Sequence, residues 1–227
     1  MPRDEEIPLI ESTPGRLVTE SFGYDGGRTV TVYVPPESPD SVVFLADGGW
    51  HVSALSEALH TAGRHSTLVV GVHGLSDDDG RLREYVLGFD KERFASHETF
   101  FVHEVGQWVI SRFGVELLPE RTGVWGASLG GEFALAMGLL HTEVFGSVLA
   151  CSPGAGFRPP DVMPSPLPRV YLVAGEDEPF FFVNATRWAA ALRDNGATVA
   201  MKHRPGEHGG SFWAEEFPLM IDWSFGH

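Results

Sequence analysis

The chain has 227 residues, of which 43% are hydrophobic, and this is enough for one sizeable core. Acidic residues outnumber basic ones by 31 to 16, giving a net charge of −15 without a basic tract, which disfavours binding to nucleic-acid phosphates. The start of the chain lacks the basic and apolar regions of a secretory signal, and no stretch is apolar enough to span a membrane. We therefore expect one domain over residues 1–227, with 1–15 as an N-terminal extension, in a cytoplasmic protein without nucleic-acid or membrane partners.

The first two strands are expected to form an antiparallel hairpin. Residues 16–23 and 28–34 alternate apolar and polar side chains, and Asp25-Gly26-Gly27 between them is a turn signal. The later strands are short, continuous apolar runs, as is typical of strands that are covered on both faces. They are expected at 42–46, 68–72, 146–151 and 170–174, with further strands at 121–125 and 197–203.

Helical patterns alternate with these strands, at residues 98–113, 131–141 and 181–195. Such alternation predicts a three-layer α/β sandwich around a mostly parallel sheet. The proline-rich segment 152–168 is expected to be an ordered loop, since strand patterns resume directly after it. It is too short for a lid domain, so we expect an open cleft.

The pentapeptide Gly126-Ala-Ser128-Leu-Gly130 lies between an expected strand and an expected helix. A G-x-S-x-G pattern at such a turn presents a nucleophilic serine, because small neighbours let the backbone pass closely and expose the hydroxyl. The alternative is that these glycines only close a strand-to-helix turn. The flanking pattern favours Ser128 as a nucleophile.

A nucleophilic serine needs a base to accept its proton. Among the ten histidines, His208 lies in a glycine-rich loop beyond the last expected strand, where ligand sites of open α/β sheets occur. His203 lies inside that strand. We therefore expect His208 to be the base.

The base in turn needs a carboxylate that orients it. Glu176, Asp177 and Glu178 follow the strand at 170–174. The alternative for these acids is a solvated turn that caps the next helix. Glu178, directly before Pro179, is the favoured triad acid, and Asp177 is the second choice.

Acyl transfer also needs N–H donors for the developing oxyanion. The backbone of Leu129, after the nucleophile, is expected to supply one donor. Gly49 is the candidate for the second, in the turn Asp47-Gly48-Gly49-Trp50 after the strand at 42–46. The alternative is an ordinary glycine turn with Trp50 in the core.

Trp50, Arg83 and Tyr85 are the expected substrate-binding residues. Aromatic side chains at such places are equally often part of a core, and an arginine beside acidic neighbours more often forms a surface ion pair. His97 and His103 are six residues apart rather than four, which disfavours a zinc-binding helix. Cys151, the only cysteine, excludes a disulfide within the chain and a cysteine zinc cluster. We expect no metal and no cofactor.

The order of these motifs resembles the putative-esterase family of α/β-hydrolases, which includes enterochelin esterases, esterase D, feruloyl esterase domains and mycolyltransferases. The resemblance spans residues 28–223 and is carried by Leu45–Trp50, close to L-L-D-G-x-x-W, by Gly126–Gly131, by Gly175–Glu178, and by Gly206–His208 followed by Trp213. Weaker matches are Arg83-Glu84-Tyr85, against R-x-x-E-[LY], and Phe100–Val105. Within the family, the acid stands third after the glycine and the residue after the D-G pair donates to the oxyanion, which implies Glu178 and Gly49.

The chain also departs from the family pattern. It has Gly206-Glu207-His208-Gly209 where the family often has G-G-H-[DE], and Gln107-Trp108 where a proline-tryptophan pair is usual. Both departures leave the substrate subclass open. The resemblance implies a serine carboxylic-ester hydrolase acting through an acyl-enzyme on a soluble or bulky, siderophore- or feruloyl-like ester. Two alternatives remain open: an acyltransferase that uses an alcohol acceptor, and a catalytically silent binding domain.

Overall fold

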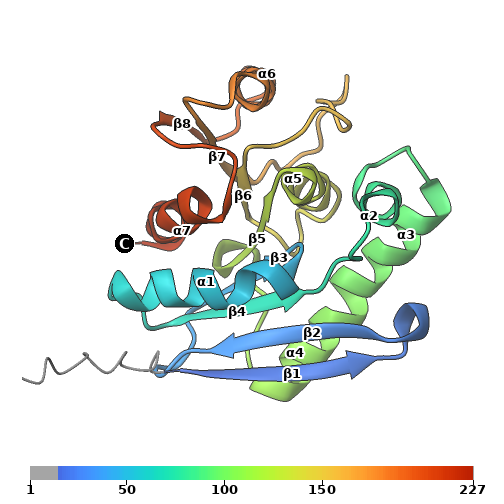
Figure 1. Cartoon of the computed structure of the whole chain (residues 1–227), viewed down its shortest axis with the longest axis vertical. Coiled ribbons are helices and arrows are strands. Elements are labelled where there is room, and N and C mark those ends of the chain that lie inside the picture. The colour runs from blue at the N-terminus through green and yellow to red at the C-terminus, as the bar shows by residue number, and fades with distance from the viewer. Residues whose placement is uncertain (1–14, 227) are drawn as a thin grey trace, which may run out of the picture.

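The computed structural model describes residues 15–226, so residues 1–14 of the expected extension lie outside it. Eight strands form one sheet in the order β1-β2-β4-β3-β5-β6-β7-β8 (Figure 1). Their bounds are β1 Arg16–Phe22, β2 Arg28–Val34, β3 Ser41–Leu45, β4 Thr67–Val72, β5 Thr122–Ala127, β6 Ser147–Cys151, β7 Arg169–Gly175 and β8 Val199–Arg204. Strand β2 pairs antiparallel with β1 and β4, and every other pairing is parallel. The expected mostly parallel sheet with an N-terminal antiparallel hairpin is confirmed.

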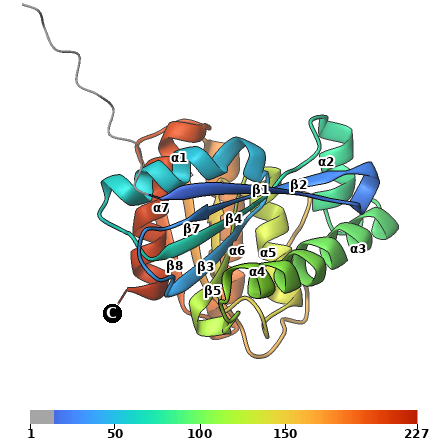
Figure 2. The ribbon, with the colours of Figure 1, turned by 90° about the horizontal axis from the view of Figure 1, so that it is seen from below.

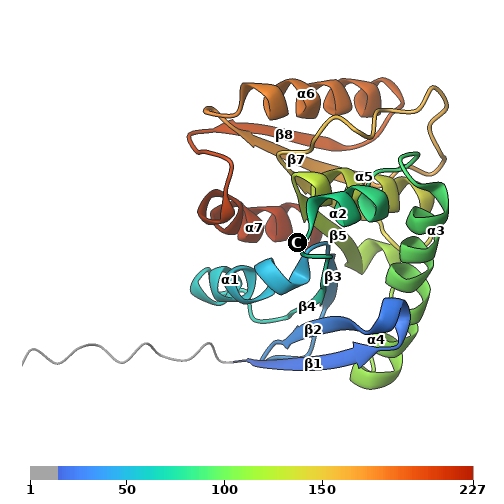
Figure 3. The ribbon, with the colours of Figure 1, turned by 45° about the vertical axis from the view of Figure 1, so that its right-hand side comes forward.

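Helices cover both faces of the sheet (Figures 2 and 3). Their bounds are α1 Gly48–Thr61, α2 Asp78–Tyr85, α3 Lys91–Thr99, α4 Val105–Phe113, α5 Leu129–Leu140, α6 Pro179–Asp194 and α7 Gly210–Phe225, and the π-helical turn η2, Phe100–Glu104, joins α3 to α4. One apolar cluster packs α1 and α7 against one face, and a larger cluster packs α3 to α6 against the other. The three-layer sandwich follows from these two clusters.

The predicted helices are present, but the structure has more helices than the sequence patterns indicated. The segment expected as a helix at 98–113 belongs to a longer helical run that begins at Lys91. Helix α1 begins at Gly48, where two glycines indicated only a turn, and α7 contains Pro218, which normally interrupts a helix. Residues 152–168 contain no helix or strand, in agreement with the expected loop. Within residues 15–226, no helix has the length and apolar character needed to cross a membrane.

Two helical glycines provide a matched test of this packing. A Cβ added at Gly138 of α5 would lie 2.0 Å from Val148 Cγ2 in β6, whereas a Cβ at Gly106 of α4 would be 3.5 Å from Leu117 Cδ1. We expect Gly138→Ala to lower the free energy of unfolding by about 1–3 kcal/mol, because it overpacks the layer between α5 and the sheet. Gly106→Ala should raise it by about 0.5–1 kcal/mol, because alanine is the better helix former. Urea unfolding measures both, and equal effects would contradict the packing argument.

Candidate active site

The candidate catalytic residues come from four separate segments that meet at one edge of the sheet. Gly49 follows β3, Ser128 follows β5, Glu178 follows β7 and His208 follows β8. All four strands are parallel, so their carboxyl ends lie at the same edge, where open α/β sheets bind ligands. The fold therefore places these segments side by side although 159 positions separate Gly49 from His208 in the sequence.

Ser128 lies on a strained turn between β5 and α5. Its backbone has φ 57° and ψ −120°, a conformation that L-residues rarely adopt. The strand and helix pass so closely that a Cβ on Gly126 would lie 1.9 Å from the carbonyl oxygen of Gly130. The amide of Ser128 donates to the carbonyl of Cys151 over 3.0 Å, which fixes the turn to the neighbouring strand β6. The glycines of the G-x-S-x-G pattern are thus required by sterics, and Ser128 lies directly after the last residue of β5.

Glu178 and His208 form a direct hydrogen bond. His208 Nδ1 donates to Glu178 Oε1, which leaves Nε2 as the free ring nitrogen. The carboxylate is 3% exposed, whereas the imidazole is partly open to solvent. The ring of Phe181 stacks on the imidazole with centroids 4.1 Å apart. Asp177, the second choice for this role, is exposed, so Glu178 is the acid of this segment that contacts the histidine.

Within residues 15–226, the direct hydrogen bond of His208 runs to Glu178 and not to Ser128. In free enzymes the bond between nucleophile and base is often long and tightens only with substrate bound. The structure therefore holds a preformed pair of Glu178 and His208 at the sheet edge where the partly exposed Ser128 lies. His203 contacts Phe182 instead, with stacked rings 3.9 Å apart.

The two expected oxyanion donors lie in the first turns of two helices. Leu129 opens α5, and Gly49 is the second residue of α1, so our interpretation of residues 47–50 as a simple turn was wrong. N–H groups in the first turn of a helix have no acceptor within the helix and are free for an anion. The two turns touch, because a Cβ on Gly130 would lie 3.1 Å from Ala46 Cβ and 3.3 Å from Asp47 Oδ2.

Asp47 anchors the turn that carries Gly49. Its buried carboxylate accepts from Arg81 Nε at 3.1 Å and Nη2 at 2.6 Å, and from the hydroxyl of Tyr85 at 3.1 Å. Tyr85 is 0% exposed, so the expectation that it contacts substrate was wrong, and the ring instead supports Asp47 from inside. Trp50 is 59% exposed, lies under the Arg81 guanidinium and lines a hollow of about 180 Å³ with Gly49.

Arg83, also expected at the substrate, lies on the outer side of α2. Its guanidinium donates to Asp79 over 2.8 Å and is 3.7 Å from Asp90. The buried arginine of this helix is Arg81, three residues before Glu84, so the R-x-x-E-[LY] spacing is met by Arg81, Glu84 and Tyr85 rather than from Arg83. Arg83 therefore forms a surface ion pair, which was the alternative to a substrate-binding role.

The family model described as "Putative esterase" matches residues 22–223. The chain belongs to the putative-esterase family. Similar solved structures include the enterobactin esterase of Shigella flexneri, with 21% identity and a TM-score of 0.72, covering 92% of this chain and 58% of that one. A ferulic acid esterase has 17% identity and a TM-score of 0.71 over 93% of this chain and 98% of that one. The S-formylglutathione hydrolase of Staphylococcus aureus has 12% identity and a TM-score of 0.72 over 93% and 99%.

At these identities, the structural likeness establishes the α/β-hydrolase fold that this esterase family shares. The chain spans less than two thirds of the enterobactin esterase. A comparison with curated proteins found no match. Family membership and fold thus agree with the resemblance that the motifs indicated.

Two residues of the site were not singled out from the sequence: Asp47, which forms a buried pair with Arg81 under the turn that carries Gly49, and Ser152, which contacts Glu178. Ser152 Oγ lies 2.8 Å from Glu178 Oε2 and 3.1 Å from Trp213 Nε1. A serine directly after a buried strand carries no sequence signal for this role. For Asp47, a signal was available, because it lies inside the quoted family motif Leu45–Trp50. Within the described part of the chain, no group of three or more His, Cys, Asp or Glu side chains is arranged to hold a metal ion.

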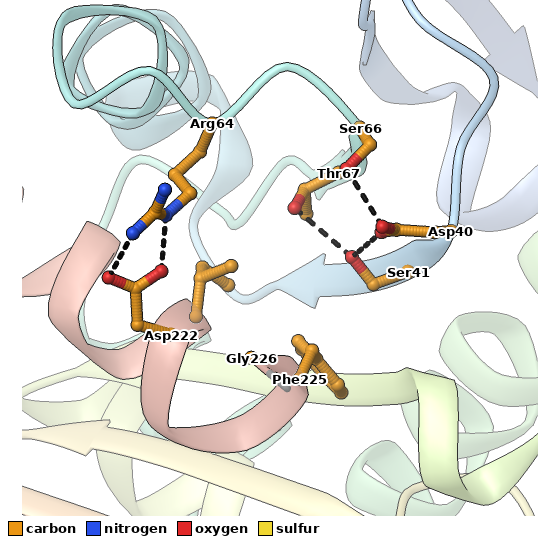
Figure 4. A pocket seen from close by; sticks show the side chains of 9 residues that line it. Asp40, Ser41, Arg64, Ser66, Thr67, Asp222, Phe225 and Gly226 are labelled. Carbon is orange, nitrogen blue, oxygen red and sulfur yellow. Dashed lines mark hydrogen bonds and ion pairs between the residues drawn. The ribbon is translucent and has the colours of Figure 1, made fainter.

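A separate pocket of about 510 Å³ lies at the opposite edge of the sheet, where β3 and β4 begin (Figure 4). Its polar side chains bond to one another: Asp40 accepts from Ser41 and Ser66, and Arg64 pairs with Asp222. The amino edge of an α/β sheet is not where such folds bind their ligands. We therefore place the active site at the other edge.

The two arginines of α2 provide a direct test of how the Asp47 turn is held in place. Arg81→Ala would leave the Asp47 carboxylate buried without its cation, so we expect the free energy of unfolding to fall by about 3–5 kcal/mol. Arg83→Ala removes only an exposed ion pair and should leave stability and KM unchanged. Urea unfolding and ester hydrolysis measure these effects. A raised KM in Arg83→Ala would indicate that Arg83 does contact substrate. An unchanged stability in Arg81→Ala would contradict the role of Arg81 in holding Asp47.

Behind the site, Glu84 of α2 is fully buried and bound by two arginines. Arg28 donates to its two carboxylate oxygens over 3.0 and 2.7 Å, and Arg93 donates over 2.5 Å. Burial opposes ionisation of Glu84, but the bonds from Arg28 keep its pKa below the usual value. His97 lies beside it in a ring of aromatic side chains, and burial lowers the pKa of His97 to about 4 despite the charge of Glu84.

This buried histidine predicts a dependence of stability on pH. The unfolded chain binds a proton at His97 near pH 6.5 and the folded chain only near 4, so stability is complete above 6.5 and declines as the pH falls toward 4. Relative to His97→Phe, we expect the wild type to lose about 2 kcal/mol of unfolding free energy between pH 7.5 and 5. Urea unfolding at both pH values measures it. Parallel pH profiles for the two proteins would contradict a neutral buried imidazole.

Proposed function

We propose that the protein is a serine carboxylic-ester hydrolase that works through an acyl-enzyme. The observation that carries this proposal is the hydrogen bond between Glu178 and His208 at the sheet edge where the strained Ser128 turn projects. A carboxylate that orients a histidine beside a serine is the arrangement that activates a serine hydroxyl. Membership of the putative-esterase family supports the same reaction class.

In the proposed reaction, Ser128 Oγ attacks the ester carbonyl carbon while His208 Nε2 accepts the hydroxyl proton. Glu178 holds Nδ1–H and stabilises the imidazolium. The N–H groups of Leu129 and Gly49 stabilise the tetrahedral oxyanion. When the intermediate collapses, the bond to the alkoxide breaks and His208 returns the proton to the departing alcohol. Water then repeats the sequence on the acyl-enzyme, so the acid is released and Ser128 regains its proton.

The proposed substrate is a soluble or bulky small-molecule ester. Trp50 and Phe180 are both 59% exposed, at the starts of α1 and α6, and offer flat apolar surface beside the catalytic edge. The segment 152–168 is a short loop here. The likeness to an enterobactin esterase and a ferulic acid esterase supports siderophore-like and feruloyl-like esters as the first classes to examine. A cytoplasmic location and independence of nucleic acid and membranes stay predictions.

The test compares hydrolysis of p-nitrophenyl acetate and butyrate by the wild type and by Ser128→Ala. We expect kcat/KM to fall at least about a thousandfold in the variant, the order seen when a triad serine is removed. His208→Ala should fall comparably, whereas His203→Ala, a histidine on β8, is the matched control and should keep its activity. Equal turnover by Ser128→Ala would overturn the proposal. A new ester product when alcohols are added would instead identify an acyltransferase, and no turnover or fluorophosphonate label in either protein would favour a silent binding domain.

A further inference from the structure

Glu178 has a second set of hydrogen bonds that the reaction scheme does not use. Oε1 faces His208, while Oε2 accepts from the hydroxyl of Ser152 at 2.8 Å and from the backbone N–H of Gly175 at 2.7 Å. A carboxylate that is buried this completely needs donors on both oxygens to remain ionised. Among the residues that the structure describes, Ser152 is the one side chain that donates to Oε2, and it is itself 0% exposed.

The direction of each bond through Ser152 is fixed by chemistry. Trp213 Nε1 lies 3.1 Å from Ser152 Oγ, and an indole N–H can only donate. An ionised carboxylate can only accept. Ser152 Oγ therefore accepts from Trp213, and its single hydrogen is directed at Glu178. The same indole ring meets the imidazole of His208 edge to face, with centroids 4.9 Å apart and planes at 86°.

Ser152 is also held in an unfavourable backbone conformation. Its φ is 45°, in the left-handed region that residues other than glycine rarely occupy. Its N–H donates to the carbonyl of Val173 over 2.7 Å, and the carbonyl of the preceding residue, Cys151, accepts from Ser128 N–H. Backbone strain of this kind persists where surrounding structure enforces it, and it concentrates at functional sites. The dipeptide Cys151-Ser152 thus joins the turn of Ser128 to the side chain of Glu178.

We propose that Ser152, oriented by Trp213, is a positioning residue that sets the orientation and charge of Glu178 and through it the basicity of His208. This inference rests on the proposed serine esterase function. Loss of the Ser152 hydroxyl removes one donor from the carboxylate, which becomes a stronger base and favours the protonated imidazole. The loss also lets the carboxylate and the imidazole bonded to it turn together away from Ser128. Both effects lower the fraction of enzyme that is ready to accept the proton of Ser128.

The experiment measures the rate of fluorophosphonate labelling of Ser128, and p-nitrophenyl acetate hydrolysis, from pH 5 to 9. For Ser152→Ala we expect both rates at pH 7 to fall at least about tenfold, as for loss of a bond to a charged group, with KM nearly unchanged. The acid limb of the profile should move to higher pH by roughly half a unit or more. Ser56→Ala is the matched control: Ser56 is also buried, but its hydroxyl donates to Val52 within α1.

Ser152→Gly separates this effect from folding. Glycine tolerates the left-handed backbone, so this variant should be at least as stable as Ser152→Ala in urea, yet show the same slow rate and the same shifted acid limb. Trp213→Phe keeps a ring against His208 but removes the N–H, and should give a smaller change in the same direction. Wild-type rates in both serine variants, or slow rates with an unmoved acid limb, would overturn the inference. Labelling that persists in Ser128→Ala would instead refute the proposed function itself.

Discussion

The close crossing of β5 and α5 is the constraint on which the rest of the site depends. Gly126 and Gly130 let the strand and helix backbones pass at a distance that no side chain allows, and this passage puts Ser128 at φ 57°. Strain of this kind costs about 1–3 kcal/mol and needs a rigid surrounding to persist. Helix α5 supplies it, because ten of its residues are buried between the sheet and the outer helices. The reactivity proposed for Ser128 is therefore a property of the packed core and not of the turn alone.

The carboxylates of Asp47 and Glu178 are both buried at the same sheet edge, but their hydrogen-bond partners differ. Asp47 is paired with the guanidinium of Arg81, a permanent cation, so its charge is compensated whatever happens in the site. Glu178 is bound by a hydroxyl, a backbone N–H and His208, and of these only the histidine can become charged. The negative charge of Glu178 is thus paired with a positive charge only when the His208 imidazole accepts a proton. In the proposed reaction, this difference suits Asp47 to holding the turn that carries Gly49, and Glu178 to stabilising a charge that exists only during the reaction.

The sequence predicted the sheet and the order of the site segments because both rest on local patterns. Continuous apolar runs mark the central strands, and the glycines around Ser128 are required by a backbone approach within a single turn. Tyr85 was misplaced because its role depends on Asp47, 38 positions away, and no local pattern reports which way an aromatic ring faces. Ser152 was missed for the same reason, since its partners Glu178 and Trp213 are brought to it only by the fold. Helix α1 was missed because Gly48 and Gly49 normally end helices rather than begin them.

The ion pairs around Glu84 connect the outermost strands to the catalytic edge. Asp25 and Arg28 belong to the hairpin of β1 and β2, Glu84 lies in α2, and the same helix carries Arg81, which holds Asp47. Edge strands usually open first, and their free backbone groups are open to pairing with other chains. Here, detaching the hairpin would remove Arg28 from the buried Glu84 carboxylate and leave Arg93 as its remaining arginine partner, so fraying at this end of the sheet would loosen α2, the helix that carries Arg81. The hairpin is consequently tied by charge to the same helix, α2, that holds the Asp47 turn in place.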